Sequence, residues 1–199
     1  MKKSNKTLLR VILLALFSAM SFVLFLLEFP VIPGLSYLKL DLSDIPALIG
    51  AVIFGPVFGV LVELFKNILE LSVKGIGTQM GFGNLMNFIV GCAFIVPFSI
   101  IFRKITDNGK CKQMIGVIIA GFVSLISIVA IGIVGNYLIA PLFFKYFLGV
   151  ELSDSALWTA IWGATALNAV KGVMLWVVAI PLVAVIRKRL GHLLLNSHN

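Results

Sequence analysis

Three polar side chains interrupt the last two long apolar stretches of the chain: Asn136, Asn168 and Lys171. Asn168 and Lys171 are three residues apart, so they share one face if this stretch is helical. The side-chain amide of asparagine offers a hydrogen-bond donor and an acceptor in one plane. That geometry suits the edge of a flat heterocycle that carries alternating carbonyl and ring-nitrogen groups. One interpretation is therefore that these side chains point into an outward-facing pocket.

Lys171 also has a purely structural interpretation. An unpaired lysine in the middle of a membrane costs at least about 2.5–3.5 kcal/mol, so it needs a partner or a purpose. Glu70 is the obvious candidate, because Glu70 and Lys171 lie at similar depths when residues are counted along their helices. Glu63, Lys66, Asn67 and Glu70 form one polar helix face, on which Lys66 can also reach either glutamate. The residues alone leave both interpretations open.

A charged, extended segment precedes the second apolar stretch. Apolar and polar residues alternate over residues 38–43, which is the period of an extended segment. Ser43 or Asp44 then stands before Ile45-Pro46, the pattern of a helix cap followed by proline in the first turn. Polar backbone at membrane depth is tolerated only against protein or a water-filled cavity. We therefore expect this segment to form the edge of a cavity.

The acidic residues of this junction allow a different class of function. A membrane-embedded enzyme would need Asp41, Asp44, Glu63 and Lys66 in one cleft, whereas the expected topology puts Glu63 away from the two aspartates. A metal site is not expected, because no third ligand accompanies Asp41 and Asp44 and hard cations need more oxygens. Asp44 is more simply explained as a helix cap, and Lys39 with Asp41 as an ion pair within the loop.

The composition is that of an integral membrane protein. Of the 199 residues, 60% are hydrophobic and 12% are charged, against roughly half and a quarter in soluble domains. The net charge of +8 does not indicate nucleic-acid binding, because the cations lie beside the apolar stretches, where they set membrane topology. Their clusters are Lys2, Lys3, Lys6 and Arg10; Arg103, Lys104, Lys110 and Lys112; and Arg187, Lys188 and Arg189.

The side of the membrane on which each basic cluster falls decides the number of spans. Gly55-Pro56 divides the stretch 45–71, and a proline inside a helix removes a hydrogen bond. Two short helices here give six spans and place all three basic clusters on one side, whereas one helix gives five and separates them. The positive-inside rule therefore favours six spans with both termini in the cytoplasm. The expected spans are about 8–27, 45–54, 57–72, 85–102, 114–138 and 157–185.

The predicted fold class is an all-α integral membrane protein, in which residues 1–199 form a single transmembrane domain. It has six transmembrane helices and a partly re-entrant extended loop after the first. The basic start and the apolar run 11–27 are interpreted as a retained span, because this run is longer than a usual signal-peptide core and no small-x-small cleavage site follows.

The segment Leu38–Pro46, followed by Gly50, resembles the signature of the riboflavin-specific S-component, the substrate-binding subunit, of energy-coupling factor (ECF) vitamin transporters. Asn168–Gly172 and the pair Ala15 and Ala19 strengthen the resemblance. It implies a subunit of an importer in the bacterial cell membrane, embedded in the lipid bilayer, that captures external riboflavin. Riboflavin would be cargo, so the resemblance implies no cofactor and no enzyme. The implied partners are a transmembrane coupling subunit and two cytoplasmic ATPases.

The resemblance also implies roles for particular residues. Asn136, Asn168 and Lys171 match ligand-binding positions of the family, whereas Ala15 and Ala19 match positions that face the coupling subunit. Internal helix packing explains small residues at fourfold spacing about as well. The alternatives are an S-component for another vitamin or for a flavin nucleotide. The expected ligand-binding residues are Leu38, Lys39, Leu40, Asp41, Gly83, Asn84, Asn136, Asn168 and Lys171.

Overall fold

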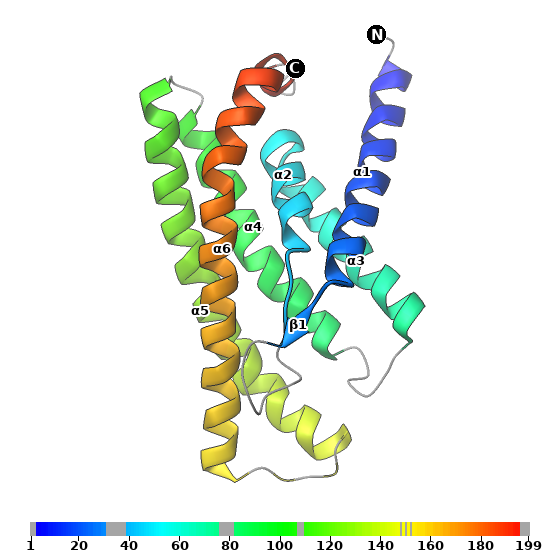
Figure 1. Cartoon of the computed structure of the whole chain (residues 1–199), viewed down its shortest axis with the longest axis vertical. Coiled ribbons are helices and arrows are strands. Elements are labelled where there is room, and N and C mark those ends of the chain that lie inside the picture. Colours follow the sequence, from blue (N-terminus) through cyan, green and yellow to red (C-terminus); the bar gives the residue numbers. More distant parts are fainter. Residues whose placement is uncertain are drawn as a thin grey trace.

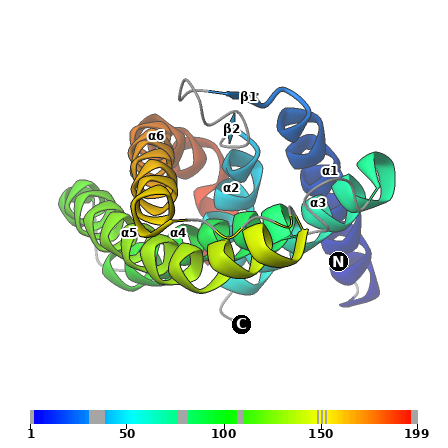
Figure 2. The ribbon, with the colours of Figure 1, turned by 90° about the horizontal axis from the view of Figure 1, so that it is seen from below.

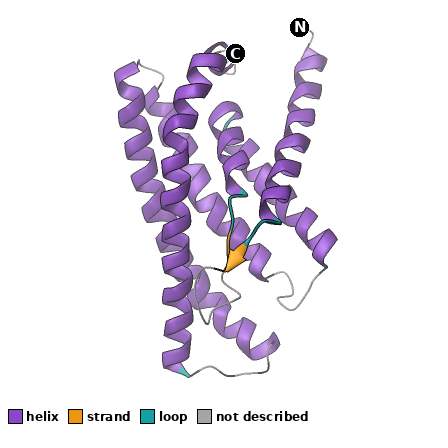
Figure 3. Cartoon of the chain, viewed as in Figure 1, coloured by secondary structure: helices purple, strands orange, loops and turns teal. Residues whose placement is uncertain are grey.

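The computed structural model describes residues 3–30, 39–75, 82–106, 110–147, 149, 151 and 153–195. These residues form six helices and one short pair of antiparallel strands (Figures 1 and 3). Phe29 pairs with Leu40 and Pro30 pairs with Lys39. The elements are α1 (Lys3–Phe25), β1 (Phe29–Pro30), β2 (Lys39–Leu40), α2 (Asp44–Phe54), α3 (Pro56–Lys74), α4 (Phe82–Thr106), α5 (Lys110–Phe147) and α6 (Asp154–Leu195).

The helices run back and forth along one bundle axis. α1 begins at the same end of the bundle at which α6 ends, and α4 ends and α5 begins there too (Figure 1). The helix segments that carry the basic clusters therefore lie at one end of the bundle, as the prediction of six spans requires. Within the described residues, α1, α4, α5 and α6 are each long and apolar enough to cross a membrane. The helix α2 is shorter, with 11 residues.

The predicted division at Gly55-Pro56 is confirmed. Gly55 has a φ of 108°, a backbone conformation that favours glycine, and it separates α2 from α3. Pro56 is the first residue of α3, where its missing N–H leaves no helix bond unmade. The side chain of Arg103 donates a hydrogen bond of 3.4 Å to the carbonyl of Ile53, just before this turn. α2 and α3 therefore form an antiparallel hairpin.

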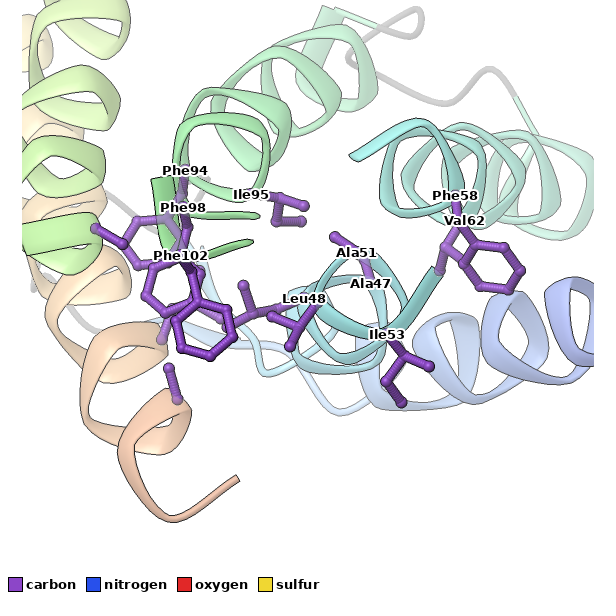
Figure 4. Packing of buried hydrophobic residues seen from close by; sticks show 14 of the residues in the cluster. Ala47, Leu48, Ala51, Ile53, Phe58, Val62, Phe94, Ile95, Phe98 and Phe102 are labelled. Atoms are coloured by element: carbon purple, nitrogen blue, oxygen red, sulfur yellow. The ribbon is translucent and has the colours of Figure 1, made fainter. Parts of the chain in front are cut away.

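The short helix α2 lies at the centre of the fold. It contacts α1, α3, α4 and α6, and Figure 2 shows it between α6 and α1. Leu48 and Ala51 are fully buried in an apolar cluster that also contains residues of α3 and α4 (Figure 4). On α4, the rings of Phe94, Phe98 and Phe102 stack in sequence, with centroids 5.7 and 6.1 Å apart.

Small residues allow the helices to approach each other closely. A Cβ atom added at Gly59 of α3 would lie 2.6 Å from the Cβ of Ala51 and 3.0 Å from the carbonyl oxygen of Ala47. This is how helices pack where lipid offers no hydrophobic drive. The stripes Gly116, Ala120, Ser124 and Gly132 on α5, and Ala160, Ala164 and Gly172 on α6, are buried as well. Ala15 and Ala19 differ, because both are exposed on α1.

The close approach at Gly59 generates a prediction for stability. Gly59→Val should lower the free energy of unfolding by about 1–3 kcal/mol, because the added atoms collide with α2. Val57→Leu is the control, since Val57 is on the same helix and 71% exposed. Thermal unfolding in detergent measures both effects. Equal unfolding temperatures for the two variants would contradict this account of the α2–α3 contact.

Candidate ligand-binding cavity

A cavity of about 360 Å³ lies at the end of the bundle where α1 and α3 end and α4 begins. It is also lined by α5 and by the first half of α6. Its apolar wall includes Phe25, Phe82, Met86, Phe143 and Phe144. The volume falls in the range of about 300–1,000 Å³ that is typical of small-molecule sites. The cavity lies opposite the end that carries the basic clusters.

Most of the residues predicted to bind a ligand meet in this cavity. They come from five different elements or segments of the chain, which only the folded bundle brings together. Leu40 is buried on β2 beside them but does not line the cavity, and Leu38 is outside the described residues. The predicted residues that line the cavity are Lys39, Asp41, Gly83, Asn84, Asn136, Asn168 and Lys171.

Three oxygen atoms surround the buried ammonium group of Lys171. Its Nζ lies 2.9 Å from Oδ1 of Asn87, 3.0 Å from Oδ2 of Asp44 and 3.3 Å from Oδ2 of Asp41. The expected pairing of Lys171 with Glu70 is therefore wrong. Counting residues along a helix gives depth but not direction, and Lys171 on α6 lies toward α2. Lys171 has structural partners and also lines a cavity, so its two interpretations describe parts of one arrangement.

Asp44 joins Lys171 to a second buried lysine. Its Oδ1 lies 2.7 Å from Nζ of Lys66, and that same Nζ lies 2.6 Å from Oε2 of Glu63. None of these three side chains is exposed. Asp44 and Lys66 lie eleven residues before and after Gly55, so the α2–α3 hairpin brings them level. We call Asp41, Asp44, Glu63, Lys66 and Lys171 the buried charge network.

The buried charge network corrects two further predictions. Asp44 does not cap α2 by its side chain: it is the first helical residue, and its carboxylate contacts two lysines. Glu63 does not lie away from Asp44, because the two carboxylates share Lys66. These acids nevertheless do not form a cleft, since Asp44, Glu63 and Lys66 do not line the cavity. Among the described residues, no group of His, Cys, Asp and Glu is arranged to hold a metal ion.

The last residues before α2 bury their polar side chains, whereas in β2 it is the apolar Leu40 that is buried and Lys39 that is exposed. Asp41 and Ser43 are buried, whereas Leu42 between them is 40% exposed. The carboxylate of Asp41 accepts a hydrogen bond of 2.8 Å from the backbone N–H of Ser43 and another from the hydroxyl of Ser43. The alternation predicted over residues 38–43 therefore holds only from Asp41 to Ser43, and there it places the carboxylate of Asp41 beside Lys171 and at the cavity wall.

An ion-pair network ties the rim of the cavity together. Glu28, just after α1, lies 2.7 Å from Nζ of Lys39 and 2.9 Å from Nζ of Lys74. Lys74 also lies 3.2 Å from Glu70, which accepts a hydrogen bond from Asn84. The sequence suggested an ion pair between Lys39 and Asp41, but Lys39 is paired with Glu28 instead. These contacts connect β2 and the ends of α1 and α3 with the start of α4.

Glycine in α5 makes room for the two asparagines of the last two helices. A Cβ atom at Gly132 would lie 2.5 Å from Nδ2 of Asn168, so only glycine leaves space for that amide. Asn136, one turn later on α5, donates a hydrogen bond of 2.8 Å to the carbonyl of Gly132. Both asparagines line the cavity. The small-residue stripe of α5 therefore places these two amides at the cavity wall.

Sequence reasoning left four polar residues of the cavity out of the predicted ligand-binding set: Glu28, Glu70, Lys74 and Asn87. A signal for Asn87 was present. Asn84 and Asn87 are three residues apart at the start of a membrane span, which puts their side chains on one helix face. Glu28 and Lys74 carry no such signal, because each lies at the edge of an apolar stretch, where charged residues are common.

The helices, the apolar wall and the convergent polar groups define a membrane-embedded protein that binds a small molecule. Residues 9–183 match the model of the substrate-specific component of ECF transporters. The chain therefore belongs to this family of transporter components of the bacterial cell membrane, and its function is transport rather than catalysis.

Individual relatives agree with this assignment. The chain is 37% identical to the riboflavin transporter FmnP of Bacillus subtilis, over 85% of this chain and 87% of the relative. It is 31% identical to the riboflavin transporter RibU of Staphylococcus aureus, over 87% of each. A solved structure of the S component of a bacterial ECF transporter is similar with a TM-score of 0.68 and 27% identity, over 96% of this chain and 99% of that one.

The buried charge network generates a prediction for stability. Lys66→Met should lower the free energy of unfolding by about 3–5 kcal/mol, because it leaves two buried carboxylates without their shared cation. Glu63→Gln is the matched comparison and should cost much less, since Lys66 keeps Asp44. Thermal unfolding in detergent tests both. If Lys66→Met were as stable as Glu63→Gln, the network would not hold α2 against α3.

Proposed function

We propose that this chain captures riboflavin from outside the cell and presents it to a partner complex for import. The observation that carries the proposal is the meeting of Asn136, Asn168 and Lys171 at one apolar-walled cavity. Planar amide groups beside aromatic and aliphatic walls suit a flat ring system with polar groups along its edge. The naming of FmnP and RibU as riboflavin transporters supports this choice of heterocycle.

The orientation in the membrane supports capture from outside. Arg103 and Lys104 lie in the last turn of α4, at the end where α1 begins and α6 ends. The positive-inside rule assigns that end to the cytoplasm. The cavity lies at the other end, between the end of α1 and the start of α4. Its mouth would then face the external medium.

The rim favours the neutral vitamin over its phosphate. Lys39 and Lys74 are the cations of the rim, and both contact Glu28. Lys74 is further paired with Glu70. A phosphate would have to compete with these carboxylates for the two lysines, and it would bring additional negative charge next to them. Riboflavin avoids this cost because its side chain carries hydroxyl groups and no charge.

Import requires a partner that supplies energy. The chain has no phosphate-binding loop of the Gly-x-x-x-x-Gly-Lys-Ser/Thr type. Membership of the ECF family suggests a transmembrane coupling subunit and two cytoplasmic ATPases. The face of α1 that carries Ala15 and Ala19 is suited to the coupling subunit, because both residues are exposed and small enough for close helix contact.

Binding by the cavity residues can be tested directly. Lys171→Met and Asn168→Ala should each weaken riboflavin binding by about 1–3 kcal/mol, the cost of leaving a buried polar partner unpaired. Quenching of riboflavin fluorescence by the purified protein in detergent measures the affinity. The phosphate ester of riboflavin should bind more weakly than riboflavin to the unaltered protein. Lys104→Met, at the opposite end of the bundle, is the control. Unchanged affinity in both cavity variants, with intact folds, would reject this site.

The docking role of α1 requires a transport measurement. Ala15→Trp and Ala19→Trp should leave riboflavin affinity unchanged and reduce uptake by cells at least severalfold, because a bulky side chain keeps the partner helix at a distance. Ala130→Trp, on the exposed side of α5, is the control for a large residue at the protein surface. Normal uptake by both α1 variants would count against this face as the docking surface.

A further inference from the structure

The side chain of Asn87 is held in one orientation by its neighbour. Its Oδ1 lies 2.9 Å from Nζ of Lys171. An ammonium group can only donate hydrogen bonds, so the oxygen of the amide must face it. The Nδ2 group of Asn87 consequently points away from Lys171. The orientation of this amide thus follows from the charge of its partner.

The Nδ2 group of Asn87 has no partner among the described protein groups. It is buried, and Asn87 is one of the residues that line the cavity. Buried amide donors are almost always hydrogen-bonded in folded proteins, because an unpaired one costs free energy. Nδ2 is closed to a water-sized molecule in this arrangement, so a ligand acceptor in the cavity would satisfy this donor after neighbouring side chains shift.

Lys171 has less free hydrogen-bonding capacity than Asn87. An ammonium group carries three donors, and three oxygens lie near this one, at 2.9, 3.0 and 3.3 Å. Lys171 can reach a ligand only by giving up one of these contacts, of which the one to Asp41 is the longest. Asn87 can donate without breaking any contact that it makes.

We infer that Asn87 is a further ligand-binding residue, whose Nδ2 donates to a carbonyl acceptor at the edge of the bound heterocycle. The inference rests on the proposed function, since it assigns a donor to the same cavity. Lys171 then has two tasks, which are to orient the amide of Asn87 and to present positive charge beside the acceptor edge of the ligand.

The variant Asn87→Asp distinguishes a ligand-binding role of Asn87 from a role that only positions Lys171. Asn87→Asp keeps an oxygen for Lys171 but loses the donor, whereas Asn87→Ala loses both. If Asn87 binds the ligand, both variants should weaken riboflavin binding by about tenfold or more. If it only positions Lys171, Asn87→Asp should bind as well as the unaltered protein. Leu85→Ala, on the same turn of α4 but 48% exposed, is the control.

The experiment measures riboflavin affinity by fluorescence quenching for these variants, after unfolding temperatures have confirmed that they fold. Absence of binding by the unaltered protein would overturn the proposed function itself. Binding by the unaltered protein together with undiminished affinity of Asn87→Asp would overturn only the role of Asn87.

Analogues of riboflavin provide a second measurement. Replacing the carbonyl oxygen at position 2 or 4 of the ring by sulfur weakens it as an acceptor. The unaltered protein should lose about tenfold in affinity at one of the two positions, and Asn87→Ala should lose this discrimination. Undiminished discrimination in Asn87→Ala would assign the contact to another donor of the cavity and would overturn the inference. Equal affinity for riboflavin and both analogues would overturn the inference.

Discussion

The carboxylate of Asp44 is the contact on which the rest of this structure depends. It lies between two lysines from different helices, Lys66 on α3 and Lys171 on α6. A charge in a membrane has no water to stabilise it, so each of these groups requires the others. Because Asp44 is the first residue of α2, this single side chain sets the position of the central helix against both neighbours. The packing of small residues around α2 then completes the core.

The same arrangement makes the binding cavity. The segment that enters α2 buries Asp41 and Ser43 and places Asp41 beside Lys171. Asp44, Glu63 and Lys66 of the buried charge network lie on α2 and α3 and do not line the cavity. Lys171 and Asp41 do line it, and so does Asn87, which contacts Lys171. Structural charge and ligand-binding charge are therefore neighbours in this fold. A change of Lys171 therefore alters the cavity wall and the buried charge network together.

Much of the site could be predicted from the sequence because polar residues are rare in membrane spans and need a reason to be there. Asn136, Asn168 and Lys171 stand out for this reason, and all three line the cavity. The partners of the charged residues could not be predicted in the same way. The sequence offers Glu70 as one candidate partner of Lys171, and Asp41 as a candidate partner of Lys39, yet the structure pairs these lysines with other groups. Several carboxylates at similar depth were available to each lysine, and sequence distance does not choose among them.

The sequence by itself determined the number of helices, the end of the bundle that carries the basic clusters and the break at Gly55-Pro56. These features follow from hydropathy, from basic clusters and from the geometry of glycine and proline, all of which act locally. Only the tertiary structure decided which faces meet. The α2–α3 hairpin places Asp44 beside Lys66. The packing of α6 against α2 places the same carboxylate beside Lys171. Contacts between helices depend on the rotation of each helix about its own axis, which a run of apolar residues leaves open.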